Sequence, residues 1–289
     1  MMSRFPEWLR RSIPAESSRL TRKILEQYRL NTVCESALCP NRSECWSRRT
    51  ATFMILGNAC TRRCGFCAIE TGRGEAVAWD EPERVAEAAR ALGLNYVVVT
   101  SVARDDLADE GAGQFAGCVR AIRDRIPDAE VEVLTPDFHG RAELIGQICE
   151  AGPTVYNHNL ETVARLQRLV RPQAGYERSL EVVRGVSENF PGIVTKSGLM
   201  LGLGEREEEV LEAAGDLREA GCEILTLGQY LAPGENHLPV RGYVSPEVFA
   251  RLADTIRRLG FRKVYAGPYV RSSYHAEETF HFSESGRGV

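Results

Sequence analysis

Three cysteines in one short stretch are the residues whose types and spacing most clearly indicate chemistry. They are Cys60, Cys64 and Cys67, in the run CTRRCGFC. Structural zinc sites usually take four protein ligands, often as two C-x2-C pairs, which makes zinc the weaker interpretation. Three thiolates on one loop suit a [4Fe–4S] cluster that keeps one iron without a protein ligand. Because such an iron can bind a substrate or cofactor, the spacing predicts an iron–sulfur site with one open position.

A second group of three cysteines precedes the first. Cys34, Cys39 and Cys45 lie within CESALCPNRSECW, and no histidine lies near them in the sequence to act as a fourth ligand. By itself this group predicts either a zinc loop or half of a second cluster, whose fourth ligand comes from elsewhere or is absent. The other cysteines lie in apolar helical or pre-strand settings, and we interpret them as buried small hydrophobic residues: Cys118, Cys149 and Cys222.

Composition narrows the class of protein that carries these sites. The chain has 289 residues, nine cysteines and a formal net charge of −4. A long chain without an apolar signal segment does not fit a secreted disulfide scaffold, and we expect a cytoplasmic protein. The mild acidity argues against a nucleic-acid partner, because binding to a phosphate backbone draws on clustered positive charge. No apolar run approaches the roughly 20 residues of a membrane-spanning helix, so we expect no membrane partner.

The elements that must position the cysteines begin near residue 50, where short apolar β-type runs alternate with longer amphipathic runs. This alternation predicts βαβ units and a parallel sheet. We expect an α/β fold with a partial (β/α)6 TIM-type barrel, and a doubly wound sheet is the alternative. The barrel would span 50–240, between an N-terminal extension 1–49 with the second cysteine group and a C-terminal extension 241–289. Strands are expected at 51–57, 96–100, 130–134, 154–157, 193–201, 223–227 and 263–266, and helices at 18–28, 82–92, 114–125, 141–150, 161–169, 176–189, 205–220 and 246–259.

The carboxyl ends of these strands are nearly all polar. In a parallel barrel the functional site collects at those ends, so the pattern favours one shared cavity beside the first cysteine group. For any single residue, an ordinary polar loop position is the alternative. Lys196 is notable because lysine is rare in this chain and a cation at a strand end can bind a carboxylate; a surface lysine is the alternative. The polar ends are 58–60, 100–101, 135–137, 157–159, 196–197 and 229–230.

From about residue 31 to residue 277 the chain resembles the lipoyl synthase family of the radical-SAM superfamily, in which SAM is S-adenosylmethionine. The three-cysteine run, Phe66 before its last cysteine and its place after the first strand are typical of the superfamily. GPYVRSSYHA (267–276) is the most specific match to the family. The other matching stretches are Cys34 to Trp46, ATFMILGNACTRRCGFCAI (51–69), VVVTSVARDDLADEGA (97–112), EVLTPDF (132–138), NHNLETV (157–163), TKSGLMLGLGE (195–205), LTLGQYLAP (225–233) and HLPV (237–240).

The resemblance implies insertion of two sulfur atoms at C6 and C8 of a protein-bound octanoyl chain. A [4Fe–4S] cluster on Cys60, Cys64 and Cys67 would bind SAM, and an auxiliary [4Fe–4S] cluster would donate the sulfur. In this family the first serine of the RSSY motif ligates the auxiliary cluster, which here implies Ser272 together with Cys34, Cys39 and Cys45; a turn in a polar tail is the alternative for this serine. The candidate SAM contacts are Phe66, Thr100, Ser101, Asn157, Asn159, Glu161, Arg171 and Lys196.

The resemblance also implies partners. These are octanoylated lipoyl domains of 2-oxoacid dehydrogenase E2 subunits and the glycine-cleavage H protein, a ferredoxin or flavodoxin-type electron donor, and an iron–sulfur carrier protein for cluster repair. Two other functions remain open: a methylthiotransferase, which the acidic balance disfavours, and a metal-binding module without catalysis, which does not account for an open iron beside polar strand ends. Four arginines near the cysteines would meet an acidic carrier domain or form a solvated basic face: Arg48, Arg49, Arg62 and Arg63.

Overall fold

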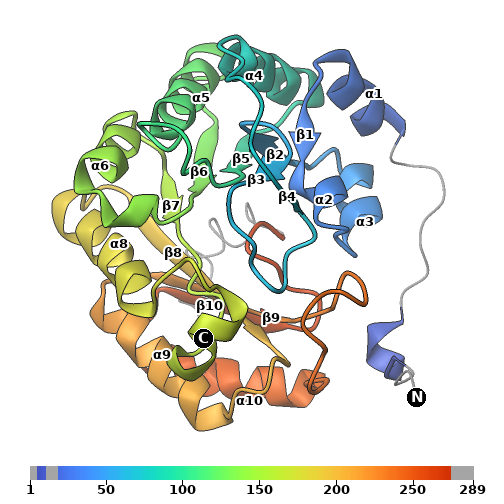
Figure 1. The fold of residues 1–289 in the computed structure, drawn as a ribbon, viewed down its shortest axis with the longest axis vertical. Helices are drawn as coiled ribbons and strands as arrows, with labels where there is room; N and C mark the ends of the chain where they lie inside the picture. Colours follow the sequence, from blue (N-terminus) through green and yellow to red (C-terminus); the bar gives the residue numbers. More distant parts are fainter. Residues whose placement is uncertain (1–4, 11–18, 275–289) are drawn as a thin grey trace, which may run out of the picture.

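A computed structural model describes residues 5–10 and 19–274 and arranges them around one curved eight-stranded sheet (Figure 1). Seven strands run parallel in the order β2-β5-β6-β7-β8-β9-β10, and the short β1 (Asn31–Thr32) pairs antiparallel with β2 at one edge. The helices form a ring on the outer face of the sheet. No pairing among the described strands joins the two edges, so the barrel is open. This arrangement confirms the partial barrel over the doubly wound alternative.

The parallel strands begin and end within two residues of their predicted positions. Strand β10 follows a helix from the expected C-terminal extension and pairs parallel with β9, so the α/β alternation continues past residue 240. The proposed division of the chain at residues 49 and 240 stays a prediction. The strands are β2 (Thr52–Ile55), β5 (Tyr96–Ser101), β6 (Glu130–Leu134), β7 (Val155–Asn157), β8 (Val194–Leu201), β9 (Ile224–Gln229) and β10 (Lys263–Gly267).

Seven of the expected helices are present, although residue 18 of the first lies outside the described residues. Each of four helices is followed by a glycine with a positive φ, the left-handed conformation that ends a helix most easily without a Cβ: Gly93 (69°), Gly152 (79°), Gly221 (85°) and Gly260 (89°). The helices are α1 (Arg19–Gln27), α4 (Glu81–Leu92), α5 (Ala112–Arg125), α6 (Ala142–Glu150), α8 (Tyr176–Asn189), α9 (Glu207–Glu219) and α10 (Pro246–Arg257).

Two regions differ from the sequence expectation. The helix predicted over 161–169 is wrong: a 3-10 turn at Ala164–Leu166 and the short helix α7 (Gln167–Val170) stand there instead. The N-terminal extension, for which only the helix at 18–28 was predicted, also contains α2 (Val33–Ser36) and α3 (Arg42–Ser47). A separate pair of short strands, β3 (Ala59–Cys60) and β4 (Glu70–Thr71), frames the first cysteine loop, and further 3-10 turns lie at Glu7–Leu9 and Phe138–Gly140.

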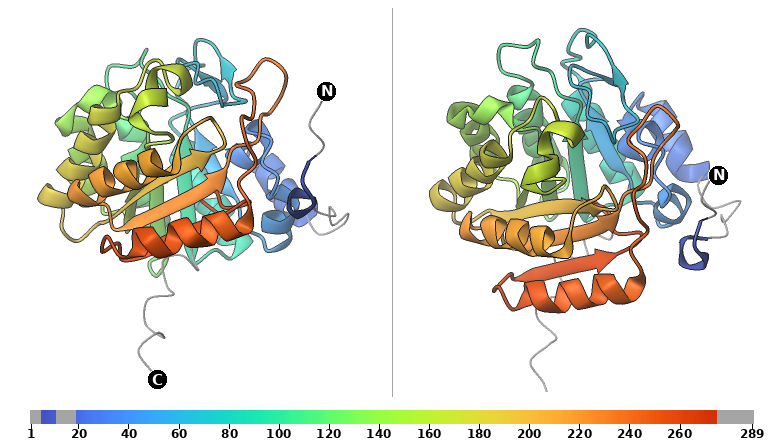
Figure 2. Two further views of the ribbon diagram at one scale, coloured as in Figure 1. Left: turned by 90° about the horizontal axis from the view of Figure 1, so that it is seen from below. Right: turned by 60° about the horizontal axis from the view of Figure 1, so that its bottom comes forward.

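Alternating side chains along the strands separate an outer core from the barrel interior. Val97 and Val99 of β5 pack outward with Phe115 of α5, whereas Tyr96 and Val98 point inward. Figure 2 shows the helical layer outside the sheet and the N-terminal helices beside its first strand. Among the described helices, none is long and apolar enough to cross a membrane. The three scattered cysteines are buried, as predicted: Cys118, Cys149 and Cys222.

Candidate functional site

The first cysteine group begins at Cys60, the last residue of β3, and continues on the loop that follows. Two backbone N–H groups point at the sulfur of Cys60, those of Arg62 at 3.4 Å and Ala103 at 3.3 Å. Donors in these positions stabilise a thiolate, because hydrogen bonds to a charged acceptor are stronger than those between neutral groups. The loop is fixed further along, where the N–H of Gly65 donates to the carbonyl of Val170 at 2.9 Å. The backbone therefore pre-arranges this loop to hold anionic sulfur.

Arg62 braces the same loop from inside. Its Nη1 donates to Asp137 at 2.6 Å and its Nη2 to Asp105 at 2.8 Å, and its side chain is only 5% exposed. Burial raises the pKa of Asp137, but the charge and hydrogen bond of Arg62, together with the nearby His158 and Arg171, outweigh burial and lower that pKa to about 2. Arg62 is thus an internal ion-pair partner, and its assignment to a solvated face or a carrier contact is wrong. The other three arginines are exposed, and their role stays a prediction: Arg48, Arg49 and Arg63.

The sulfurs of the first group are not gathered around the position of a single metal ion. Thiolates around one tetrahedral zinc at about 2.3 Å lie about 3.8 Å from each other. Within the part of the chain that the structure describes, the sulfurs of this group do not gather within 4.8 Å of one another. Burial raises the pKa of Cys64 to about 11 and that of Cys67 to about 12. Both thiols therefore keep their protons at neutral pH until a metal displaces them.

The second cysteine group is divided between two short helices and the turn that joins them. Cys34 lies in α2, Cys39 in the turn and Cys45 in α3. Helix α2 begins where the hydroxyl of Thr32 accepts a hydrogen bond from the N–H of Glu35, an N-cap. Burial raises the pKa of Cys34 to about 11 and that of Cys45 to about 12, and a charge on Cys39 raises both further. The thiols are close enough to repel each other when ionised, as ligands of one centre must be.

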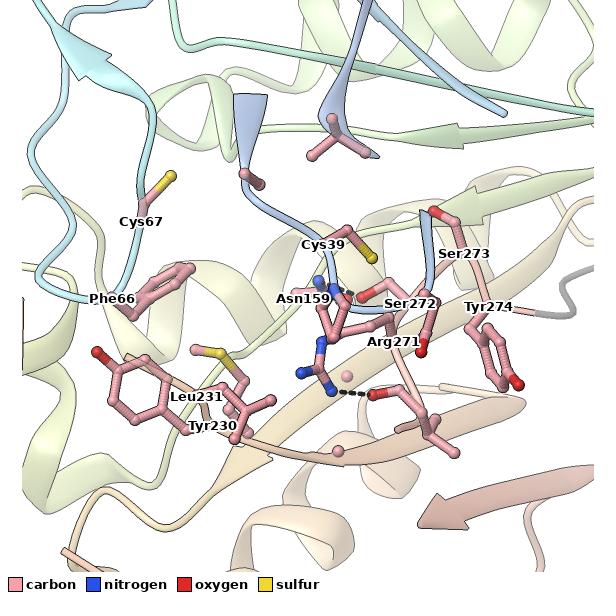
Figure 3. A pocket seen from close by; sticks show the side chains of 18 of the residues that line it. Cys39, Phe66, Cys67, Asn159, Tyr230, Leu231, Arg271, Ser272, Ser273 and Tyr274 are labelled. Atoms are coloured by element: carbon pink, nitrogen blue, oxygen red, sulfur yellow. Dashed lines mark hydrogen bonds between the residues drawn. The ribbon is translucent and has the colours of Figure 1, made fainter. Parts of the chain in front are cut away.

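The segment that carries Ser272 reaches this second group from the far end of the chain. Nδ2 of Asn41 donates to the carbonyl of Tyr269 at 2.7 Å, and the hydroxyl of Tyr274 donates to Glu44 at 2.9 Å. These contacts join residues 228 and 230 positions apart. They hold Ser272 beside the second cysteine group (Figure 3). Its ligation of iron stays a prediction, and residues 275 and 276 of the matching stretch lie outside the described residues.

One cavity of about 410 Å³ lies between the two cysteine groups (Figure 3). Phe66 and Cys67 line it from the first loop. The three cysteines of the second group line it as well, and so does Ser272: Cys34, Cys39, Cys45 and Ser272. Much of the remaining wall is apolar: Leu38, Leu134, Leu199, Met200, Leu231 and Val270. Both groups therefore open into the same largely apolar space.

Three of the candidate SAM contacts line this cavity, namely Phe66, Asn159 and Glu161. Glu161 has a φ of 68° and forms a bridge to Leu199, which turns its side chain into the barrel. Burial raises the pKa of Glu161, although the charge of Arg171 opposes this effect. Arg171 also donates from Nη1 to the backbone carbonyl of Asn159 at 2.8 Å. Contact of these four residues with SAM stays a prediction.

The other candidates have different surroundings. Lys196 is 1% exposed, and its Nζ lies 2.9 and 3.0 Å from the two carboxylate oxygens of Glu132, so the surface-lysine alternative is wrong. Asn157 donates to the same carboxylate at 2.8 Å, and Thr100 donates to the carbonyl of Leu134 at 2.9 Å. Five of the eight candidates are not among the residues that line the cavity: Thr100, Ser101, Asn157, Arg171 and Lys196. Contact of each with SAM stays a prediction.

Two acidic residues were given no role by the sequence, although both position the first loop. Asp137 follows β6 and Asp105 follows β5, and both bind Arg62. Asp105 also accepts from the hydroxyl of Thr61 at 2.9 Å. The sequence pattern that could have identified them is a carboxylate shortly after a buried strand, together with an arginine within the cysteine motif. What the sequence did not show is which carboxylate meets which cation.

Comparison with known proteins agrees with this geometry. The model of the radical SAM superfamily matches residues 54–217, and the chain belongs to this superfamily. The superfamily implies one [4Fe–4S] cluster and SAM. Among solved structures, the hydrogenase maturase HydG matches with a TM-score of 0.55 and 16% identity, covering 91% of this chain and 74% of that one. Streptococcus suis SuiB bound to SAM matches with a TM-score of 0.58 and 12% identity, over 78% and 53% of the two chains; both matches show a common fold.

Relatives of higher identity define the family within this superfamily. A lipoyl synthase of Rhodopirellula baltica is 56% identical over 95% of this chain and 88% of its own length. That of Caldanaerobacter subterraneus is 53% identical over 96% of this chain and 97% of its own. The mitochondrial lipoyl synthase of Nematostella vectensis is 51% identical over 96% and 95%. The chain belongs to the lipoyl synthase family.

Proposed function

We propose that this enzyme inserts two sulfur atoms, at C6 and C8, into an octanoyl chain carried by a lipoyl domain. The observation that carries the proposal is the single cavity between the two cysteine groups. A substrate chain in that space touches the wall formed by Cys67 on one side and the wall formed by Ser272 on the other. One site that only activates SAM would not require a second cysteine group on the same cavity.

The candidate ligand residues of each site fit the cofactors that we expect there. Cys60, Cys64 and Cys67 would hold the cluster that binds SAM, and when bound these cofactors supply the one-electron chemistry that an unactivated C–H bond requires. Acid–base chemistry is insufficient here, because no side chain is basic enough to take such a proton. The second cluster is the proposed sulfur source, with four ligands: Cys34, Cys39, Cys45 and Ser272.

The residues of this chain have separate tasks in the reaction. The apolar wall receives the octanoyl chain and excludes water, which keeps the reacting carbons apart from competing hydrogen donors. Arg62 and its two carboxylates hold the first loop in place, so that Cys67 lines the cavity. Ser272 offers a hard oxygen ligand among softer thiolates, and a ligand of this kind is easier to displace from iron. That property suits a cluster that must give up sulfur.

We also propose the protein partners that this reaction requires. The substrates are octanoylated lipoyl domains of 2-oxoacid dehydrogenase E2 subunits and the glycine-cleavage H protein. A ferredoxin or flavodoxin-type protein would supply electrons, and an iron–sulfur carrier would restore the second cluster. We expect the reaction in the cytoplasm.

The test is an anaerobic incubation of the reconstituted chain with SAM, a reductant and an octanoylated lipoyl-domain peptide. Mass spectrometry is expected to detect the gain of two sulfur atoms, and the reconstituted chain is expected to contain about eight irons. Cys60→Ala is the control, since it removes one ligand of the SAM site and should leave the peptide unchanged. Addition of a methylthio group, or an octanoyl chain that stays intact while SAM is cleaved, would refute the proposal.

A further inference from the structure

The amide of Asn159 joins the two halves of the site. Its Nδ2 donates to Oγ of Ser272 at 2.6 Å (Figure 3) and to Oε1 of Glu161 at 3.0 Å. Both protons of the amide are therefore engaged, one on the serine of the second cysteine group and one on the SAM side of the cavity. The Oδ1 atom is buried and has no hydrogen-bond partner among the described residues.

The surroundings of Asn159 fix this contact. Its backbone carbonyl accepts from Nη1 of Arg171 at 2.8 Å, and Arg171 is held in turn by Ser179 at 3.3 Å. Gly198 of β8 leaves room for the pair, because a Cβ there would lie 2.9 Å from Oδ1 of Asn159 and 3.3 Å from Oγ of Ser272. Arg171 therefore holds the backbone of Asn159, and Gly198 provides the space in which the two side chains meet.

We infer that Asn159 is a positioning residue for the second iron–sulfur site: its amide orients Oγ of Ser272 toward the cysteines and sets how firmly that oxygen holds iron. This inference rests on the proposed function, because it takes Ser272 as a ligand. It differs from the sequence expectation, which gave Asn159 a contact with SAM.

The physical basis is the behaviour of groups that surround metal ligands. A serine hydroxyl accepts two hydrogen bonds, so a donor on one lone pair leaves the other aimed at a fixed point. Partners that hold a ligand in this way typically change metal affinity 10- to 100-fold when they are removed. A structural role alone would destabilise the chain without acting specifically through Ser272.

The experiment isolates the second site in the full-length chain with Cys60, Cys64 and Cys67 replaced by alanine. This parent is reconstituted anaerobically with ⁵⁷Fe, and the rate of iron loss to a chelator is measured. Mössbauer spectra report whether one iron retains an oxygen ligand. Asn159→Asp keeps the shape but replaces the donor with an acceptor, and Asn159→Ala removes the side chain, so that a folding failure in one variant leaves the other. Asn157→Ala is the matched control, because its amide donates to Glu132 instead.

We expect each Asn159 variant, and Ser272→Ala, to lose iron about tenfold faster than the parent. If Asn159 acts through Ser272, the double variant Asn159→Ala/Ser272→Ala is no faster than the faster single variant, whereas the effects of Asn157→Ala and Ser272→Ala multiply. The oxygen-ligated iron signal should also be lost in Asn159→Asp.

Two results overturn the inference. One is iron loss at the parent rate in both folded Asn159 variants, and the other is a double variant whose effect equals the product of the single effects. A parent that binds no iron at all would instead refute the second cluster, and with it the proposed function. The separate readouts keep these two failures distinguishable.

Discussion

Cys60, Cys64 and Cys67 share one short stretch, whereas the second cysteine group, within residues 34–45, lies beside Ser272 from near the other end of the chain. The first group is braced by an ion pair inside the barrel, between Arg62 and the carboxylates that follow two strands. The second is held by contacts between the chain's two end segments, Asn41 to Tyr269 and Tyr274 to Glu44. The two regions face one cavity but draw their rigidity from different parts of the fold.

This difference matches the tasks proposed for the two sites. A site that must bind SAM repeatedly benefits from an immobile frame, and a buried ion pair between barrel elements provides one. A cluster that is taken apart and restored needs ligands that can separate. Hydrogen bonds between two end segments cost less to break than a buried charge pair, so the second region can open while the barrel stays folded.

The strongest test of the comparison removes the brace of the first region. Arg62→Ala leaves the buried Asp137 with Arg178, at 3.3 Å, as its remaining ion-pair partner among the described residues, which should lower the free energy of unfolding by about 3–4 kcal/mol. Urea unfolding of the metal-free chain measures this loss. Arg63→Ala is the matched control, because that side chain is exposed and should change the free energy by about 0.5 kcal/mol or less. Equal losses in the two variants would mean that the ion pair does not brace the loop.

A second test uses pH to weaken the barrel region alone. Nδ1 of His158 donates to the carbonyl of Thr135 at 2.9 Å, and its Nε2 accepts from Ser179 at 3.1 Å. Burial lowers the pKa of His158 from 6.5 to about 4. Between pH 4 and pH 6.5 the unfolded chain binds more protons than the folded chain. The contribution of His158 to the free energy of unfolding is therefore fully present above pH 6.5 and falls as the pH drops toward 4, by about 3 kcal/mol at most.

Unfolding of the metal-free chain at several pH values measures that slope. His158→Gln should flatten this pH dependence of the free energy of unfolding, whatever the effect of the substitution on stability at neutral pH. The same slope in both proteins would assign the acid sensitivity to another group.

The third test separates the chemistry of the two regions. Ser272→Ala should reduce sulfur insertion about 100-fold, or about 2.7 kcal/mol, while 5′-deoxyadenosine still forms from SAM, because the first cysteine group is untouched. Ser273→Ala is the matched control, since the neighbouring serine lines the same cavity. Product formation is measured by mass spectrometry of the peptide and of the nucleoside. Unchanged sulfur insertion in Ser272→Ala would refute its role as a ligand.

The comparison also explains how far the sequence could predict the molecule. The parallel strands were predictable because βαβ alternation is a local pattern, and the first cysteine group was predictable because its ligands share one loop. The brace was not, because Arg62 meets partners 43 and 75 positions away and several carboxylates stand at strand ends. A pattern shows that a charge follows a strand, but packing decides which charge it meets.

The errors have similar physical causes. The helix expected over 161–169 fails because Glu161 takes a left-handed φ of 68° to reach the cavity, which interrupts helical geometry. Helices α2 and α3 were missed because four and six residues are too few to display helical periodicity. Ser272 was found only through the family resemblance, because no local pattern joins a serine to cysteines more than 200 residues away.

The smallest expected effects come from removing one tyrosine hydroxyl in each region. Tyr274→Phe removes the hydrogen bond to Glu44, and Tyr230→Phe removes the bond to the carbonyl of Leu238 at 2.7 Å, whose N–H donates to Gly65 on the first cysteine loop. Each loss should cost about 1 kcal/mol, or a rate of iron release about fivefold faster. The release is measured in two chains that each keep one cysteine group. Tyr274→Phe should accelerate release only from the second group and Tyr230→Phe only from the first, and an effect of either variant on both sites would show that the two regions are not independent.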